Sequence, residues 1–205
     1  GAMSREGLID QARRTVAPAP VRVCVALCAS QRSVKSGCQA CVTRCPLAAV
    51  EFGDHEFTVK DDCTGCGICY AACPSGAVEL SYGDDRALGL ALRAAVAADP
   101  ARVARITCEK DARPPRYALV LPCLGRLTEY LVVSALADGA SRVEVKLPEC
   151  EACPMLRGME AFLQTIDTAR ALCHLVGRAD RLVLVDRFEG AEPGAAAVPP
   201  EPAYS

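Results

Sequence analysis

The stretch Cys-Thr-Gly-Cys-Gly-Ile-Cys-Tyr-Ala-Ala-Cys-Pro occupies residues 63–74. Cysteines at the spacing Cys-x2-Cys-x2-Cys-x3-Cys-Pro are typical of loops that hold iron–sulfur clusters, and the fourth cysteine of such a run binds a second cluster. Gly65 and Gly67 let the backbone turn tightly and approach inorganic sulfide, because glycine has no β-carbon. The alternatives are a zinc site, which takes its thiolates from two separated pairs, and disulfide bonds, which do not require several cysteines at a fixed spacing. The run therefore predicts a cluster-binding loop.

The same run occurs once more, in incomplete form, 28 residues upstream. The two copies share three cysteines, the proline and the Ala-Val-Glu that follows it. At this offset Lys35 stands in the place of Cys63, and a lysine cannot bind iron. Cys28 is the nearer upstream replacement. The polar segment 29–37 is typical of a loop insertion, which could place Cys28 beside the other three cysteines. Cys24 is the alternative. Without either thiol, the first site would hold a three-iron cluster or none.

This duplication resembles the bacterial two-cluster ferredoxins over about residues 21–82. In that family, two halves related by a pseudo-twofold axis exchange their last cysteine. The resemblance implies an α+β ferredoxin-type N-terminal domain with two [4Fe-4S] clusters. It assigns cluster 1 to Cys28, Cys38, Cys41 and Cys73, and cluster 2 to Cys63, Cys66, Cys69 and Cys45.

Local sequence patterns predict helices and strands in the first half of the chain. Residues 1–20 comprise a tag remnant, Gly1-Ala2-Met3, and an expected helix over residues 4–17. The segment Val21–Cys28 alternates as a strand with Cys24 and Cys28 on one face, and the apolar runs 50–52 and 57–59 predict a hairpin. Residues 83–100 predict a capped linker helix over 86–98, with the domain boundary near residue 100.

Strand and helix patterns alternate in the second half of the chain. They predict a small α/β domain with an open, mainly parallel sheet over residues 101–188. The expected strands cover residues 103–108, 117–122, 142–147 and 181–186, and the expected helices cover 127–137 and 155–176. Residues 189–205, rich in proline, alanine and glycine, are expected to be disordered or wrapped on a partner.

Cysteines follow three consecutive strands of the predicted sheet, and they are Cys108, Cys123, Cys150 and Cys153. Functional groups gather beyond the carboxyl ends of strands in open parallel sheets, so we expect these thiols to meet at one edge. Free cysteine is often simply a small buried residue, but that does not explain four cysteines at strand ends. Cys173, on the apolar side of a helix, is expected in the core. The four thiols could hold a [2Fe-2S] cluster, a [4Fe-4S] cluster or zinc.

A second resemblance rests on the segments Leu-Pro-Cys-Leu-Gly-Arg at 121–126, Ala-Leu-Ala-Asp-Gly-Ala at 135–140, Cys-Glu-Ala-Cys at 150–153 and Arg-Gly at 157–158. Over residues 103–186 the chain is similar to the iron–sulfur delta subunit of methyl-viologen-reducing hydrogenase. That family carries a two-iron cluster and passes electrons between a hydrogenase or formate dehydrogenase and a flavoprotein of heterodisulfide-reductase type. The chain departs from it in having no further cysteine directly after Cys108 and a shorter spacer in the last pair. Gly125 and Arg126 at a helix start would suit a negatively charged cluster.

Cysteine content, net charge and hydrophobicity exclude several classes of protein. The 205 residues include 14 cysteines and carry a net charge of −2, with no export signal and no run of ~18 apolar residues. We therefore expect a cytoplasmic protein without membrane insertion, whose cysteines are ligands rather than disulfides. Its spread charges do not suit nucleic acid, and no motif predicts independent catalysis. The sequence predicts an electron-transfer subunit with flavoprotein or metal-dependent oxidoreductase partners. The alternative is a ferredoxin-like assembly adaptor with a structural zinc in its C-terminal domain.

Overall fold

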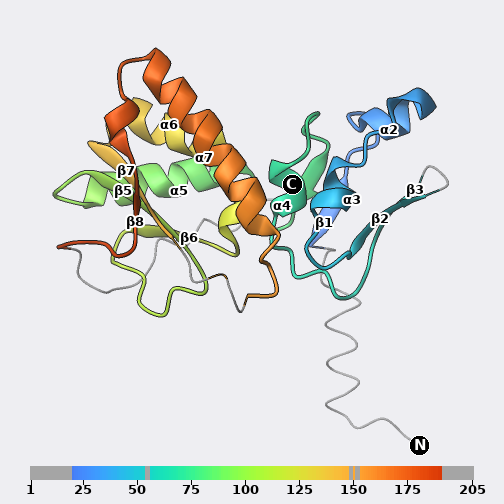
Figure 1. Ribbon diagram of the computed structural model, residues 1–205, viewed down its shortest axis with the longest axis horizontal. Helices are drawn as coiled ribbons and strands as arrows, with labels where there is room; N and C mark the ends of the chain where they lie inside the picture. Colours follow the sequence, from blue (N-terminus) through green and yellow to red (C-terminus); the bar gives the residue numbers. More distant parts are fainter. Residues whose placement is uncertain (1–19, 54–55, 148–149, 151–152, 191–205) are drawn as a thin grey trace, which may run out of the picture.

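The computed structural model describes residues 20–53, 56–147, 150 and 153–190. Figure 1 shows a small part built from short strands and helices beside a larger α/β part. The helix expected over residues 4–17 and the tail beyond residue 190 lie outside the described residues. None of the described helices is long and apolar enough to cross a bilayer.

The N-terminal part contains two pairs of antiparallel strands. β1 (Val21–Val23) pairs with β4 (Val78–Leu80), and β2 (Val50–Gly53) pairs with β3 (Glu56–Val59), which confirms the predicted hairpin. The helical elements are α2 (Ala29–Arg32), η1 (Val34–Ser36), α3 (Ala40–Arg44) and α4 (Ile68–Ala71). One repeat thus consists of β1, α3 and β2, and the other of β3, α4 and β4. The first strand of each repeat pairs with the last strand of the other, so the two halves are interlocked.

The strand predicted over Val21–Cys28 is wrong beyond Val23. β4 begins at Val78, which pairs with Val23, so the ladder has no partner for the chain that follows. The chain turns instead, with the Cys28 amide donating to the Cys24 carbonyl at 3.1 Å. The two cysteines therefore do not share a strand face, and the predicted loop at 29–37 consists largely of α2 and η1.

The C-terminal part contains the predicted parallel sheet. Its four strands are β5 (Val103–Cys108), β6 (Ala118–Leu121), β7 (Arg142–Lys146) and β8 (Leu182–Val185), in the order β6-β5-β7-β8. The helices are α5 (Asp85–Ala98), α6 (Glu129–Ala137) and α7 (Gly158–Leu175), with short turns η2 (Leu124–Arg126) and η3 (Ala179–Arg181). The predicted strands and helices are confirmed to within a few residues. Adjacent strands β5 and β7 have connections that leave in opposite directions, which creates a crevice at their carboxyl ends.

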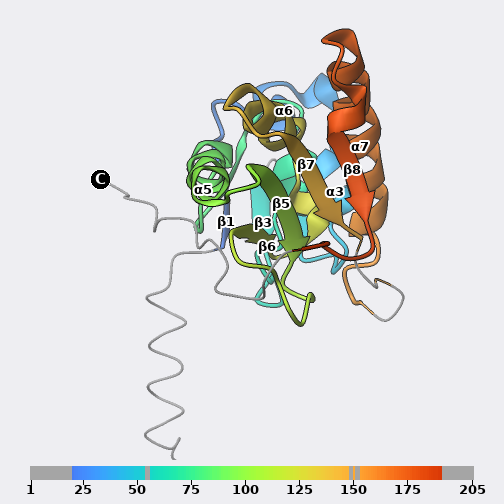
Figure 2. The same cartoon turned by 90° about the vertical axis from the view of Figure 1, so that its left-hand side faces the viewer.

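One face of this sheet is covered by helices (Figure 2). Alternate strand residues such as Ile106 and Val145 share one apolar core with residues of α5, α6 and α7. The helix α5, which the sequence indicated as a linker, contributes Leu88, Leu92 and Val96 to this core because these positions lie on one helical face. Cys173 of α7 is buried there as expected.

The opposite face of the sheet carries buried charges. Arg105 forms an ion pair with Asp99 and lies 3.6 Å from Glu144, measured from Nε to Oε2. Lys146 pairs with Asp111 at 2.7 Å. Because buried charges are costly unless paired, these contacts fix the register of β5 and β7 below the crevice where the cysteines gather.

Candidate metal centres

The first thiol set lies around one pocket of the N-terminal part. Its cysteines are Cys28, Cys38, Cys41 and Cys73. The pocket, with the open space at its mouth included, measures about 390 Å³ and has Phe52 and Phe57 of the β2–β3 hairpin in its wall. Cys24 does not line it. The structure thus brings Cys28, rather than Cys24, together with the three cysteines that the sequence grouped as cluster 1.

The interlocked strands explain the position of Cys28. In each repeat the residue after the first strand donates its amide to an alanine carbonyl: Cys24 to Ala77 at 2.8 Å, and Lys60 to Ala49 at 2.9 Å. Cys28 then follows Cys24 by four residues, and Cys63 follows Lys60 by three. The counterpart of Cys63 is therefore Cys28, and the additional residues lie between Cys28 and the next cysteine. Matching the strands, and not only the cysteines, of the two repeats could have shown this from the sequence.

The second thiol set consists of Cys63, Cys66 and Cys69 from the loop before α4, with Cys45 from the other repeat. Burial, together with the charges of neighbouring thiols such as Cys66, raises the pKa of Cys69 to about 12. Burial also raises the pKa of Cys63 and of Cys66, and Cys45 adds to both shifts. Such electrostatic coupling requires these thiols to be close. The structure thus brings together the four cysteines that the resemblance assigned to cluster 2.

In both ferredoxin-type sites a backbone amide donates a hydrogen bond to a cysteine sulfur. The Ala49 amide donates to Cys45 Sγ at 3.3 Å, and the Ala77 amide donates to Cys73 Sγ at 3.2 Å. Although burial opposes it, hydrogen bonds from Ser75 and the Ala77 amide lower the pKa of the Cys73 thiol. Amide donors to ligand sulfur are among the features that set cluster potentials. These amides therefore stabilise sulfur in its charged, iron-binding form.

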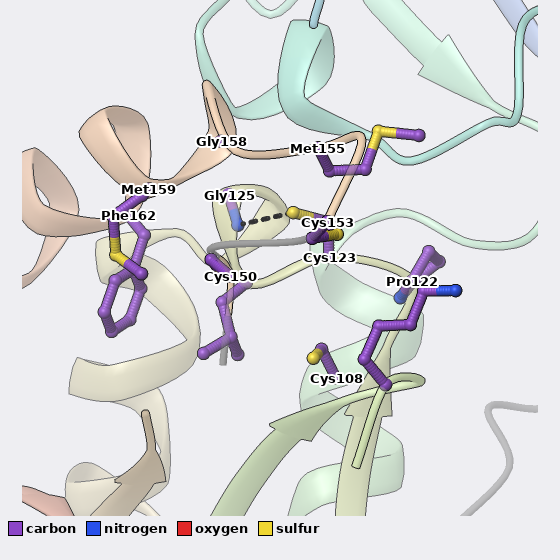
Figure 3. Close-up of a pocket in the computed structure, with 12 residues that line it drawn as sticks. Cys108, Pro122, Cys123, Gly125, Cys150, Cys153, Met155, Gly158, Met159 and Phe162 are labelled. Atoms are coloured by element: carbon purple, nitrogen blue, oxygen red, sulfur yellow. Dashed lines mark hydrogen bonds between the residues drawn. The ribbon is translucent and has the colours of Figure 1, made fainter. Parts of the chain in front are cut away.

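The third thiol set lines a pocket at the carboxyl end of the parallel sheet (Figure 3). It comprises Cys108 at the end of β5, Cys123 after β6, and Cys150 and Cys153 between β7 and α7. The pocket, with the open space at its mouth included, measures about 450 Å³ and has apolar side chains such as Met159 and Phe162 in its wall. The sequence prediction that these four cysteines meet at one edge of the sheet agrees with this arrangement.

Electrostatic contacts connect the thiols of the third set. Burial raises the pKa of Cys123 to about 11, although the Gly125 amide, 3.4 Å from Sγ, opposes the shift. The charges of Cys108 and Cys150 contribute to this raised value. Burial also raises the pKa of Cys150, and the charges of Cys153 and Cys108 contribute to the shift. Because a thiol must lose its proton to bind a metal, a metal bound by Cys123 and Cys150 would release protons.

The third set abuts the second across a close contact. Ile68, which lies between Cys66 and Cys69, packs against Gly125 and Gly158. A β-carbon on Gly158 would lie 2.8 Å from Ile68 Cδ1 and 2.9 Å from Cys123 Sγ. The charge of Cys66 also contributes to the raised pKa of Cys123. The C-terminal thiol pocket is therefore a direct neighbour of the second ferredoxin-type site.

The side chain of Arg126 points away from the C-terminal set, beside which the sequence analysis placed the helix start at Gly125 and Arg126. Arg126 does not line that pocket but extends into the N-terminal part, where its guanidinium stacks on the Tyr70 ring at 4.0 Å. It forms an ion pair with Asp85 at 2.7 Å. Gly125, in contrast, does line the pocket and donates its amide to a ligand sulfur as expected. The sequence signal was ambiguous because a residue at the end of a 3-10 turn can point to either side.

A cluster and a single metal ion place different demands on a set of thiols. Within the described residues, no three Cys, His, Asp or Glu side chains converge closely enough to hold one ion. A cluster binds through several irons, each with its own thiolate, so its ligands surround a volume. Zinc instead requires its ligands at about 2.0–2.3 Å from one centre. The thiols of the first and third sets each line a pocket, and in each of the three sets a backbone amide donates to one cysteine sulfur.

Comparison with known proteins supports an iron–sulfur site in the N-terminal part. The 4Fe-4S binding domain family matches residues 57–79. This segment contains four of the sequence-predicted ligands, Cys63, Cys66, Cys69 and Cys73, together with α4. Searches among curated proteins and among solved structures found no significant match. The chain thus contains an iron–sulfur domain of ferredoxin type that holds at least one [4Fe-4S] cluster and has a role in electron transfer.

Proposed function

We propose that this chain is an electron-transfer subunit with three cysteine-ligated iron–sulfur centres. Cys28, Cys38, Cys41 and Cys73 hold one [4Fe-4S] cluster, and Cys63, Cys66, Cys69 and Cys45 hold a second. Cys108, Cys123, Cys150 and Cys153 hold a third centre, a [2Fe-2S] or [4Fe-4S] cluster. Bound clusters of these types supply one-electron oxidation and reduction.

The observation that carries this proposal is the contact of Ile68 with Gly125 and Gly158. It places the third thiol set beside the second and leaves the first at the other end. The two glycines have no side chains that would separate the parts, and Ile68 is fully buried, so water is excluded from this boundary. The resulting order is first set, second set, third set. A structural docking site would not need its thiols next to a redox centre.

The partners in this proposal follow from the resemblance of the C-terminal part to the hydrogenase delta subunit. A chain of three centres needs a donor at one end and an acceptor at the other. We assign these places to a flavoprotein of heterodisulfide-reductase type and to a metal-dependent oxidoreductase. Val25 and Leu27, both exposed, lie beside Cys28 and offer an apolar contact near the outer end of the first set.

Electron paramagnetic resonance (EPR) of the reduced, anaerobically purified chain tests this proposal. Neighbouring paramagnetic centres broaden each other's signals, so the second cluster should show broadening that a Cys123→Ser variant removes. Cys38→Ser, which alters the first set, serves as the matched control and should leave that interaction in place. A second-cluster signal identical in the parent and in Cys123→Ser, with zinc in place of the third centre, would favour the adaptor function instead.

A further inference from the structure

A buried arginine from the C-terminal part lies against the loop that carries the second thiol set. Arg126 has 0% exposed surface. Its guanidinium stacks on Tyr70, which directly follows Cys69 in α4. Its aliphatic carbons lie against Gly67, where a β-carbon would overlap them and would come 3.0 Å from Cγ. Arg126 therefore fills the space beside the Cys66–Cys69 loop that Gly67 leaves open.

The hydrogen-bond donors of this arginine are only partly matched by protein acceptors. Nη1 donates to Asp85 at 2.7 Å. Among the residues that the structure describes, neither Nε nor Nη2 has a hydrogen-bond acceptor. The Tyr82 hydroxyl approaches without a hydrogen bond of normal geometry and has no other partner in the described part of the chain. Burial raises the pKa of Tyr82, the Arg126 charge lowers it, and Cys66 raises it, so all three groups lie close together.

An incompletely paired, fully buried cation is costly unless a negative group lies nearby. The negative group that the site supplies is the second thiolate set with its cluster. We infer that Arg126 is a positioning residue that the C-terminal part contributes to the second cluster and that raises its reduction potential. This inference rests on the proposed function. The sign follows because reduction adds negative charge, which a neighbouring positive charge stabilises.

The same contact makes the second cluster sensitive to the C-terminal part. η2, which ends at Arg126, begins directly after Cys123, a ligand of the third set. One short turn thus carries a ligand of the third centre at one end and a charge for the second centre at the other. Loading of the third centre, which fixes Cys123, also fixes the position of that charge.

Potentiometric titration of the full chain, followed by EPR, tests the inference. Arg126→Gln should make the second-cluster potential more negative, with about a tenfold change in the ratio of reduced to oxidised cluster at a fixed potential. That change corresponds to about 59 mV for a one-electron couple. Arg126→Lys should retain part of the charge effect. Arg93→Gln removes a charge from an exposed site on α5 and is the matched control, for which we expect no shift.

A second variant tests the sign independently. Asp85→Asn removes the ion-pair partner of Arg126 and should shift the second-cluster potential to more positive values. This variant decides the question if Arg126→Gln fails to fold or loses iron. Potentials unchanged in both variants, or shifted as much in Arg93→Gln, would overturn the inference. Absence of a second-cluster signal in the parent chain would instead overturn the proposed function on which it rests.

Discussion

Gly158→Ala tests the contact between the two parts of the molecule most simply. The added methyl group would lie 2.8 Å from Ile68 Cδ1 and 2.9 Å from Cys123 Sγ. Ordinary van der Waals contact begins near 3.4 Å, so both neighbours must move by about half an ångström. One of them is a proposed cluster ligand, and the other is buried between two thiol sets. The substitution therefore strains the boundary and the third set together.

Two opposing effects decide the magnitude. Overpacking a well-packed site typically costs about 1–3 kcal/mol. Gly158 is the first residue of α7, where alanine has a better helix propensity by up to about 1 kcal/mol. We therefore expect a net loss of about 1–2 kcal/mol, which lowers the folding equilibrium constant roughly 5- to 30-fold.

Urea unfolding under anaerobic conditions, with iron content measured on the same samples, checks this expectation. Gly158→Ala should unfold at lower urea and lose iron from the third centre first. Gly53→Ala, where a β-carbon meets nothing within 4 Å, is the matched control and should behave like the parent. Adding Ile68→Val, which removes Cδ1, should recover part of the loss. A Gly158→Ala variant that gains stability and keeps all its iron would refute the reasoning.

Three further predictions concern the separate parts. Cys28→Ser should abolish the first [4Fe-4S] cluster, with a loss of up to about four irons per chain, whereas Cys24→Ser should keep it; equal losses in iron analysis would contradict the ligand assignment. Hydrogen bonds from backbone amides and the Arg105 guanidinium lower the pKa of Asp99 against the opposing effect of burial. Because the folded pKa lies below the unfolded value of about 3.9, this carboxylate contributes stability above that pH and loses it as the pH falls through the folded value. Asp99→Asn should therefore cost about 3 kcal/mol at pH 7 by leaving Arg105 underpaired, and should flatten the acid limb in circular dichroism; a variant as stable as the parent would argue against a structural role for this pair. Ala48 adopts φ 50°, a backbone conformation that glycine adopts with less strain. Ala48→Gly should therefore raise the free energy of unfolding by about 0.5–1 kcal/mol, and a lower value would show that no strain is stored there.

The sequence predicted the elements whose pattern is local. The strand Val103–Cys108 was predicted to the residue, because its apolar residues lead into a cysteine and then a polar loop. The gathering of Cys108 and Cys123 also followed from topology alone, since parallel strands end at the same edge. The grouping of Cys63 with Cys45 came from the duplication and its resemblance to a family, not from any local signal.

Features that depend on contacts between distant segments could not be predicted. The strand at Val21 ends early because β4 begins at Val78, a limit set by another repeat. The direction of Arg126 depends on the space beside Gly67, about 60 residues earlier in the chain. The apolar face of α5 was visible, but which of two cores it would join was not. In each case the deciding partner lies in another part of the chain.

The central claim is that the C-terminal thiols form a third redox centre beside the second cluster. The most direct test is the content of iron, acid-labile sulfide and zinc per chain after anaerobic purification of the full protein. We expect about ten to twelve irons per chain, an equal number of acid-labile sulfides and no stoichiometric zinc. About eight irons with one zinc per chain would contradict it and would make the C-terminal pocket a structural site.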